Sequence, residues 1–272
     1  MPRWTPEDIH WDRFDASRVN PDLLKLVKAA SLTEYNAAQY TQYLNNVFSD
    51  DADFADLVAE WQVEEEQHGR MLGRYAQLAD PSFNFEAAFK AFREGYSIPV
   101  DLTESVRGSR VGELQARCIV ETGTSSFYTA MAEATDEPVL QEIARHIAAD
   151  EFRHYRLFLD GIQRYQTKEG VSLLSRLKVT VGRLKETDDD ELAFAYHCGN
   201  ELGQVAYDHG RCNAAYALLA YGMYQHHHTQ RVVRMIFKAT GLNPQGWLSG
   251  KVGDWAWKKV CQRSNRDKAL AA

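Results

Sequence analysis

The hydrophobic positions along this chain recur mostly at spacings of three and four residues, as on the buried face of an α-helix. Strand-like alternation is scarce, and Gly and Pro gather between the long periodic runs, where they would end helices. The pattern predicts helices near residues 21–48, 53–79, 102–134, 137–168, 172–186, 189–225 and 229–240. Segment 80–101 is expected to be a crossover that holds a short helix, and the order of residues 243–272 is left open.

No low-complexity segment or Gly/Ser linker divides the 272 residues, and 44% of them are hydrophobic, which is enough for a packed core. We therefore expect a single all-α domain over residues 1–272, built on a four-helix bundle with additional C-terminal helices. The bundle would span about 21–168, the extra helices about 172–240, and a basic tail 243–272.

Charge and composition narrow the possible functions. The net charge of −7 argues against general nucleic-acid binding. No run approaches ~20 consecutive apolar residues, so no membrane span is expected. The N-terminus lacks an apolar signal core, which favours a cytoplasmic protein. The four cysteines form no Cys-x-x-Cys pair, and we expect them to be reduced thiols.

Two short segments carry the same pair of a carboxylate and an imidazole. Residues 64–72 read EEEQHGRML and residues 150–158 read DEFRHYRLF, so each contains Glu-x-x-His. Because residues i and i+3 share a helix face, each Glu and His can point at one spot. Two such helices facing each other offer the oxygen and nitrogen ligands that suit iron or manganese. A dimetal site in a bundle core also needs one carboxylate from each of two further helices.

Two upstream glutamates meet this need. Glu34 lies 31 residues before Glu65, and their midpoint falls in the expected turn SDDAD. Glu121 lies 30 residues before Glu151, and their midpoint falls in the expected turn TDEP. Residues equidistant from the turn of an antiparallel helix pair lie at the same depth, here about 22 Å from each turn at ~1.5 Å per residue.

We interpret these residues as a site for two metal ions, with ligands from Glu34, Glu65, His68, Glu121, Glu151 and His154. The alternative is that both motifs are solvated helix faces. That alternative fits Glu34 and Glu121 poorly, because they sit among small and apolar residues, where an unpaired carboxylate would be costly.

At this point the chain resembles the ferritin-like di-iron carboxylate superfamily. Within it, AEWQVEEEQHGRML and IAADEFRHYRLF are most similar to the motifs EExRHG and DExRH of the soluble acyl-acyl-carrier-protein desaturases, over roughly residues 30–160. Gln67 stands where those enzymes usually have Arg in the first motif, whereas Arg153 keeps the second. The C-terminal 110 residues carry no motif that aligns, which leaves the substrate open.

The resemblance implies two iron ions, or a manganese–iron pair, in a ferritin-like bundle. It makes Glu65 and Glu151 bridging carboxylates and gives each metal one imidazole. It makes Glu34 a terminal ligand of one metal and Glu121 its counterpart at the other. In the desaturases a Thr at the position of Thr124 borders the oxygen-binding side, where it could donate a hydrogen bond or a proton. The alternative for Thr124 is a bond back to a helix carbonyl.

Several neighbours of the motifs have expected roles. Glu64 and Asp150 should point beside the site and could accept the second N–H of a metal-bound His, although Glu64 could equally lie on a solvated face. Trp61 could relay electrons but more simply packs. The remaining neighbours expected to line the core near the metals are Tyr35, Phe127 and Tyr128. The consecutive His226–His228 point ~100° apart on a helix and cannot all bind one metal.

The first functional hypothesis is an O2-dependent oxidoreductase that desaturates or oxygenates an apolar, fatty acyl substrate. The resemblance implies an acyl carrier protein or acyl thioester as substrate donor and a ferredoxin-type electron donor, and we expect a homodimer. Residues 251–268 hold six Lys/Arg against two Asp and could meet an acidic partner, or could form a solvated tail. The second hypothesis is a ferroxidase or iron-handling protein, and a third is a peroxide-reducing ferritin-like protein.

Overall fold

The chain forms an all-α, ferritin-like bundle with extra helices, seen in a computed structural model that describes residues 4–186 and 190–271. For residues 265–271 only the backbone is described. No strand occurs in the described part of the chain. The helices of the bundle and its crossover are α1 (Pro21–Tyr35), α2 (Ala37–Val47), α3 (Ala52–Ala79), α4 (Phe85–Gly95), α5 (Arg110–Ala134) and α6 (Pro138–Glu169).

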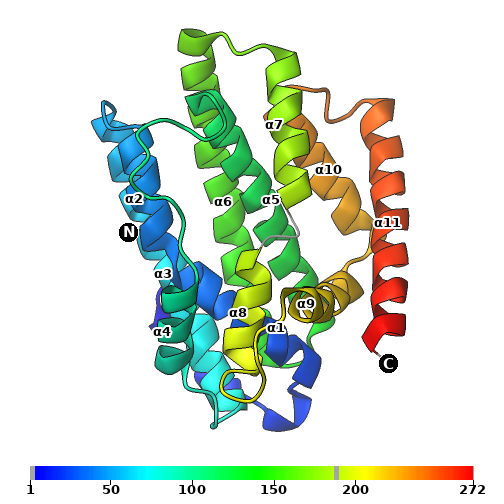
Figure 1. Cartoon of the computed structure of the whole chain (residues 1–272). Coiled ribbons are helices and arrows are strands. Elements are labelled where there is room, and N and C mark those ends of the chain that lie inside the picture. Colours follow the sequence, from blue (N-terminus) through cyan, green and yellow to red (C-terminus); the bar gives the residue numbers. More distant parts are fainter. Residues whose placement is uncertain (1–3, 187–189, 272) are drawn as a thin grey trace.

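The two hairpin turns fall where the sequence predicts them. Asp51 accepts a hydrogen bond from the Phe54 N–H at 3.1 Å and so caps the start of α3. Glu137 caps α6 in the same way, through the Leu140 N–H at 2.7 Å. The long helices α5 and α6 then run side by side through the centre of the molecule (Figure 1).

The predicted helix over 21–48 is wrong in one respect, because it is interrupted at Asn36. The Asn36 side chain accepts a hydrogen bond from Arg93 of α4 at 2.7 Å, and its N–H bonds to the Thr33 carbonyl in a tighter turn. No Gly or Pro marks this break, so local sequence rules could not locate it. The interruption lies two residues after Glu34.

Gly69 explains how closely α3 approaches the end of α1. A Cβ atom at this position would lie 2.6 Å from the Cβ and from the backbone N of Tyr35, which is too close for any other residue. Gly69 follows His68 directly, and Tyr35 follows Glu34. The glycine therefore sets the spacing of the two helices at the level of two predicted ligands.

Two more predicted boundaries are corrected. Helix α5 begins at Arg110 rather than near 102, because Gly108 adopts a φ of 77° and Ser109 caps the helix through the Gly112 N–H. The predicted helix over 189–225 is two helices separated by residues 201–208, where Gly203 has a φ of 75°. Residue 189 itself lies outside the described residues.

The C-terminal half adds further helices to the bundle, and it includes segment 243–272, whose order the sequence left open. These helices are α7 (Leu173–Lys185), α8 (Asp190–Asn200), α9 (His209–Met223), α10 (His226–Thr240) and α11 (Trp247–Ala271). Helix α8 lies against α1, whereas α7 and α10 lie against α5. Helix α11 packs on α9 and α10 and forms an outer edge of the molecule (Figure 1).

Candidate metal centre

The six predicted ligands come together in the bundle core. Two groups of four residues have ligand atoms that lie within 4.8 Å of one another: Glu34, Glu65, His68 and Glu151, and Glu65, Glu121, Glu151 and His154. All six side chains are buried. Glu65 and Glu151 belong to both groups, as expected of carboxylates that bridge two ions. Their role as ligands remains a prediction.

The first group surrounds the Nδ1 atom of His68. This nitrogen lies 3.3 Å from a carboxylate oxygen of Glu151, 3.6 Å from one of Glu34 and 4.0 Å from one of Glu65. The Tyr128 hydroxyl donates to the other oxygen of Glu34 at 2.6 Å and so fixes the orientation of that carboxylate.

The second group surrounds the Nδ1 atom of His154. It lies 2.9 Å from an oxygen of Glu65, 3.7 Å from one of Glu121 and 3.8 Å from one of Glu151. The two imidazole rings are 5.9 Å apart, centre to centre. The arrangement therefore has an approximate internal symmetry, with one imidazole and one unshared carboxylate on each side of a shared carboxylate pair.

The chemistry of the cluster fits cations. Nδ1 of His68, Nδ1 of His154 and Oε1 of Glu151 are buried, and their close contacts with one another and with the other carboxylates lack hydrogen-bond geometry, so none of them has a hydrogen-bond partner among the described residues. Burial and the charge of Glu151 raise the pKa of Glu65 and of Glu121 well above the usual range. Four carboxylates packed this closely in the core would be costly without positive charge between them. The donor set of oxygen and nitrogen atoms suits two iron or manganese ions.

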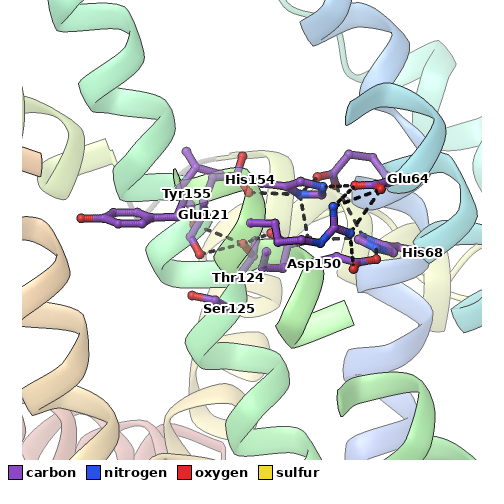
Figure 2. A network of polar contacts seen from close by, with 12 residues as sticks. Glu64, His68, Glu121, Thr124, Ser125, Asp150, His154 and Tyr155 are labelled. Atoms are coloured by element: carbon purple, nitrogen blue, oxygen red, sulfur yellow. Dashed lines mark hydrogen bonds and ion pairs between the residues drawn. The ribbon is translucent and has the colours of Figure 1, made fainter. Parts of the chain in front are cut away.

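Each imidazole is oriented by the acidic residue of the opposite motif (Figure 2). His154 Nε2 lies 2.7 Å from Glu64, and His68 Nε2 lies 3.1 Å from Asp150. The proton of each ring is therefore held on Nε2, which leaves the Nδ1 lone pair free to face the cluster. Arg153 contacts both acids and balances their charge.

The N-terminal segment supplies a contact that sequence reasoning missed. Trp4 is buried, and its indole N–H donates to Asp150 at 2.7 Å. Asp150 therefore links Trp4 to His68 through hydrogen bonds. The side chain of Gln67 donates to the Trp4 carbonyl at 2.9 Å and holds this segment in place. Gln67 is the residue that departs from the desaturase motif, and an isolated Trp near the N-terminus gives no spacing signal that could have predicted this contact.

Thr124 follows Glu121 by three residues and lies on the same face of α5. Its hydroxyl lies 3.2 Å from the Glu121 carbonyl, which is the bond back to a helix carbonyl considered from the sequence, and it also contacts a carboxylate oxygen of Glu151. Its role on the oxygen-binding side stays a prediction. Trp61 is buried and packs edge-on against His154, with ring centres 6.4 Å apart. Tyr35 differs from the prediction, because its ring packs on Phe89 of α4, with centres 4.7 Å apart, instead of lining the core near the cluster.

A cavity of about 470 Å³ adjoins the cluster, a size typical of small-molecule sites. The four predicted carboxylate ligands line it together with Thr124, Phe127 and Tyr128. Helix α5 contributes lining residues from Glu113 to Tyr128, a length of about 22 Å at ~1.5 Å per residue. The cavity is therefore elongated, and the cluster lies along its side.

Two smaller groups of possible ligands lie outside the bundle-core cluster: Glu133, His227 and His228, and His197, Glu201 and Cys212. His226–His228 begin α10, and His228 Nδ1 accepts from the Gln225 N–H at 2.9 Å, so its Nε2 carries the proton and faces Glu133. At the start of the α8–α9 loop, Glu201 lies 3.4 Å from His197 and accepts a hydrogen bond from Cys212 at 3.5 Å.

The fold and this centre define a class: a ferritin-like helical bundle whose core holds a carboxylate–imidazole cluster able to bind metal. The sequence model described as "fatty acid desaturase" matches residues 7–171, more than half of the chain, and the chain belongs to that family. Family membership indicates an oxidoreductase that acts on lipid. No curated protein matches the chain. Within the described residues, no helix combines the length and apolar character that crossing a membrane requires.

Proposed function

We propose that this protein is an O2-dependent di-iron oxidoreductase that desaturates or oxygenates a fatty acyl chain. The observation that carries the proposal is the sharing of Glu65 and Glu151 by two ligand groups beside an elongated cavity. When bound there, a pair of ferrous ions supplies the reduction of O2 and the oxidising power that an unactivated C–H bond demands.

The residues around the cluster would divide the remaining work. Glu64 and Asp150 keep the proton of each imidazole on Nε2, and Tyr128 holds Glu34 in place. Thr124 lines the cavity and contacts Glu151, so it can donate a hydrogen bond or a proton on the substrate side of the cluster. The buried bundle core keeps water from the apolar chain.

The partners of the reaction stay predictions. The sequence carries no flavin or nicotinamide motif, so electrons are expected from another protein, of the ferredoxin type. An acyl carrier protein is the expected donor of the chain, and a homodimer is the expected assembly. The exposed basic side chains of α11, Lys251, Lys258 and Lys259, would suit an acidic partner. The basic residues that follow Ser264 in segment 251–268 have side chains outside the described residues.

Single-turnover oxidation tests the proposal. The metal-free protein is loaded with ferrous iron without oxygen, reduced chemically, mixed with a panel of saturated acyl carrier proteins, and exposed to O2. We expect a loss of two mass units for an alkene, or a gain of sixteen for an alcohol, as the simple balance of removing two hydrogens or inserting one oxygen atom. Unchanged acyl masses together with accumulation of many ferric ions per chain would replace this function with iron handling.

A further inference from the structure

The cavity beside the cluster has two chemically different ends. Toward the C-terminal half of α5 its walls are aromatic and aliphatic, with contributions from Phe127 and Tyr216. Toward the N-terminal end of α5 its walls carry charged side chains, and the lining residue Val106 there is 59% exposed. The charged side chains are Arg107, Glu113, Arg117, Arg183, Glu186 and Glu191. Such a cavity suits an amphiphile, with its apolar chain passing the cluster.

Most charges at this end already have strong partners. Arg107 makes two hydrogen bonds to Glu186, at 2.5 and 2.6 Å. Glu113 accepts from the hydroxyls of Tyr43 and Ser105, both at 2.8 Å. These groups form a fixed wall, and a ligand would gain little by competing for them.

Arg117 differs from Arg107, because its guanidinium makes no hydrogen bond with the described residues. Its side chain is only 13% exposed, its nearest carboxylate oxygen is 3.8 Å away on Glu113, and its guanidinium stacks over the Tyr40 ring at 4.7 Å. Nε is buried and has no hydrogen-bond partner among the described residues. A buried guanidinium without acceptors is unfavourable, so an acceptor inside the cavity would stabilise it.

The position of Arg117 indicates what that acceptor is. Arg117 lies four residues before Glu121, about one helical turn or ~6 Å along α5, and on the side toward the charged end. Its side chain leans toward the helix N-terminus, as helical side chains do. A chain that lies along α5 with its apolar end among the aromatic residues and its head group at the charged end would therefore place that head group beside Arg117.

Charge selects between the possible head groups. Glu113 already balances much of the charge of Arg117. The other two carboxylates at this end, Glu186 and Glu191, equal in number the other two arginines, Arg107 and Arg183. A second negative charge would be repelled by Glu113, whereas an uncharged carbonyl can accept a hydrogen bond at no electrostatic cost. The carbonyl of an acyl thioester has this chemistry.

We propose that Arg117 donates a hydrogen bond to the carbonyl oxygen of an acyl thioester and thereby fixes which carbon of the chain lies beside the cluster. This inference rests on the proposed function for its acyl chain. It makes Arg117 a residue that determines the position of oxidation, counted from the thioester, independently of the total chain length.

The test uses the full-length protein and saturated acyl thioesters of several chain lengths on a carrier protein, with the matching free acids. Variants are Arg117→Met, which keeps length but removes the donors, and Arg117→Gln, which restores one N–H donor. The control is Arg70→Met, because Arg70 is an exposed arginine of α3 whose ion pair with Glu66 lies away from the cavity. Thioester binding to the metal-free protein and the position of oxidation in the iron-loaded protein are measured separately.

We expect wild type and Arg70→Met to oxidise one carbon, counted from the thioester, at every chain length. Arg117→Met should weaken thioester binding and lower kcat/KM by roughly 10–100-fold and should spread the product over several positions. Arg117→Gln should restore part of the affinity and a single product. Melting of the metal-free variants shows whether each one folds.

Three results would overturn the inference. One is thioester binding and product position that do not change in Arg117→Met, which would leave Arg117 as a hydrated structural residue. Another is Arg117-dependent binding of the free acid in preference to the thioester. The third is no binding of either by wild type. If Arg117-dependent thioester binding occurs without oxidation, the hydrogen bond from Arg117 to the thioester stands, whereas the proposed function and the role of Arg117 in the position of oxidation fail.

Discussion

Replacing Asp150 with asparagine should weaken metal binding at the His68 position and leave the His154 position nearly unchanged. Asp150 accepts the hydrogen bond that orients the His68 ring, with Oδ2 3.1 Å from Nε2. Asparagine has almost the same shape, but its amide can present an N–H to Nε2, which favours the tautomer with the proton on Nδ1. A protonated Nδ1 cannot bind a metal, so the variant would have to reverse this preference first.

The size of the effect follows from the contacts. Loss of the partner that orients a metal-bound His typically costs 10–100-fold in affinity, or about 1.4–2.7 kcal/mol. Burial alone would raise the pKa of Asp150, but hydrogen bonds from His68, Arg153 and Trp4 lower it well below the usual range. The carboxylate is therefore ionised at neutral pH, and the variant loses a full charge, which points to the upper half of that range.

The assay is an anaerobic titration of the metal-free protein with Fe²⁺ or Co²⁺, analysed for two sites. The matched control is Glu64→Gln. Glu64 lies 2.7 Å from Nε2 of His154, so this variant should weaken metal binding at the His154 position instead. Melting of both metal-free variants separates lost affinity from lost stability. Equal weakening of both sites by Asp150→Asn, or wild-type affinity at both, would refute the crossed pairing of acids and imidazoles.

Three other predictions address oxidation, stability and partners. Thr124→Val should keep both metals and slow or uncouple acyl oxidation by roughly 10–100-fold, and a wild-type single-turnover rate would count against a role for the hydroxyl. A hydrogen bond from Lys28 lowers the pKa of Asp80 to about 2, so its stabilisation is present above about pH 4 and is lost as the pH falls toward 2. Asp80→Asn should lower the free energy of unfolding by roughly 1–2 kcal/mol at pH 7, because partial exposure screens the pair, and denaturation at pH 3 should show a smaller difference. Reversing the charge of Lys258 and Lys259 should weaken carrier-protein binding in a salt-dependent way, and unchanged titrations at low salt would contradict this.

The sequence predicted the bundle and the meeting of the six candidate ligands for a clear physical reason. Helical period and mirrored distance from a turn depend only on local geometry, so Glu34 and Glu65, and Glu121 and Glu151, could be matched in depth before any coordinates were available. The same geometry placed Glu64 beside the site but left a solvated helix face equally open, and the structure shows that Glu64 is buried and meets His154.

Features that depend on tertiary contacts could not be predicted in this way. The break at Asn36 is stabilised by Arg93 from another helix, and the contact of Trp4 with Asp150 joins residues 146 positions apart. The charged end of the cavity combines residues of α5, α7 and α8, and no spacing in the sequence relates them. By contrast, Gly203 and the capping residue Asp208 were local signals that could have divided the helix predicted over 189–225.

The paired metal site is tested most directly by counting metals in three proteins. Wild type, Glu34→Ala and Glu121→Ala are loaded with ferrous iron without oxygen, freed of excess metal, and analysed for iron per folded chain. The account predicts two ions in wild type, and in each variant preferential loss of the one ion that the missing carboxylate would bind, so that the two variants lose different ions. One ion or none in the loaded wild type, or full occupancy in both variants, would contradict it.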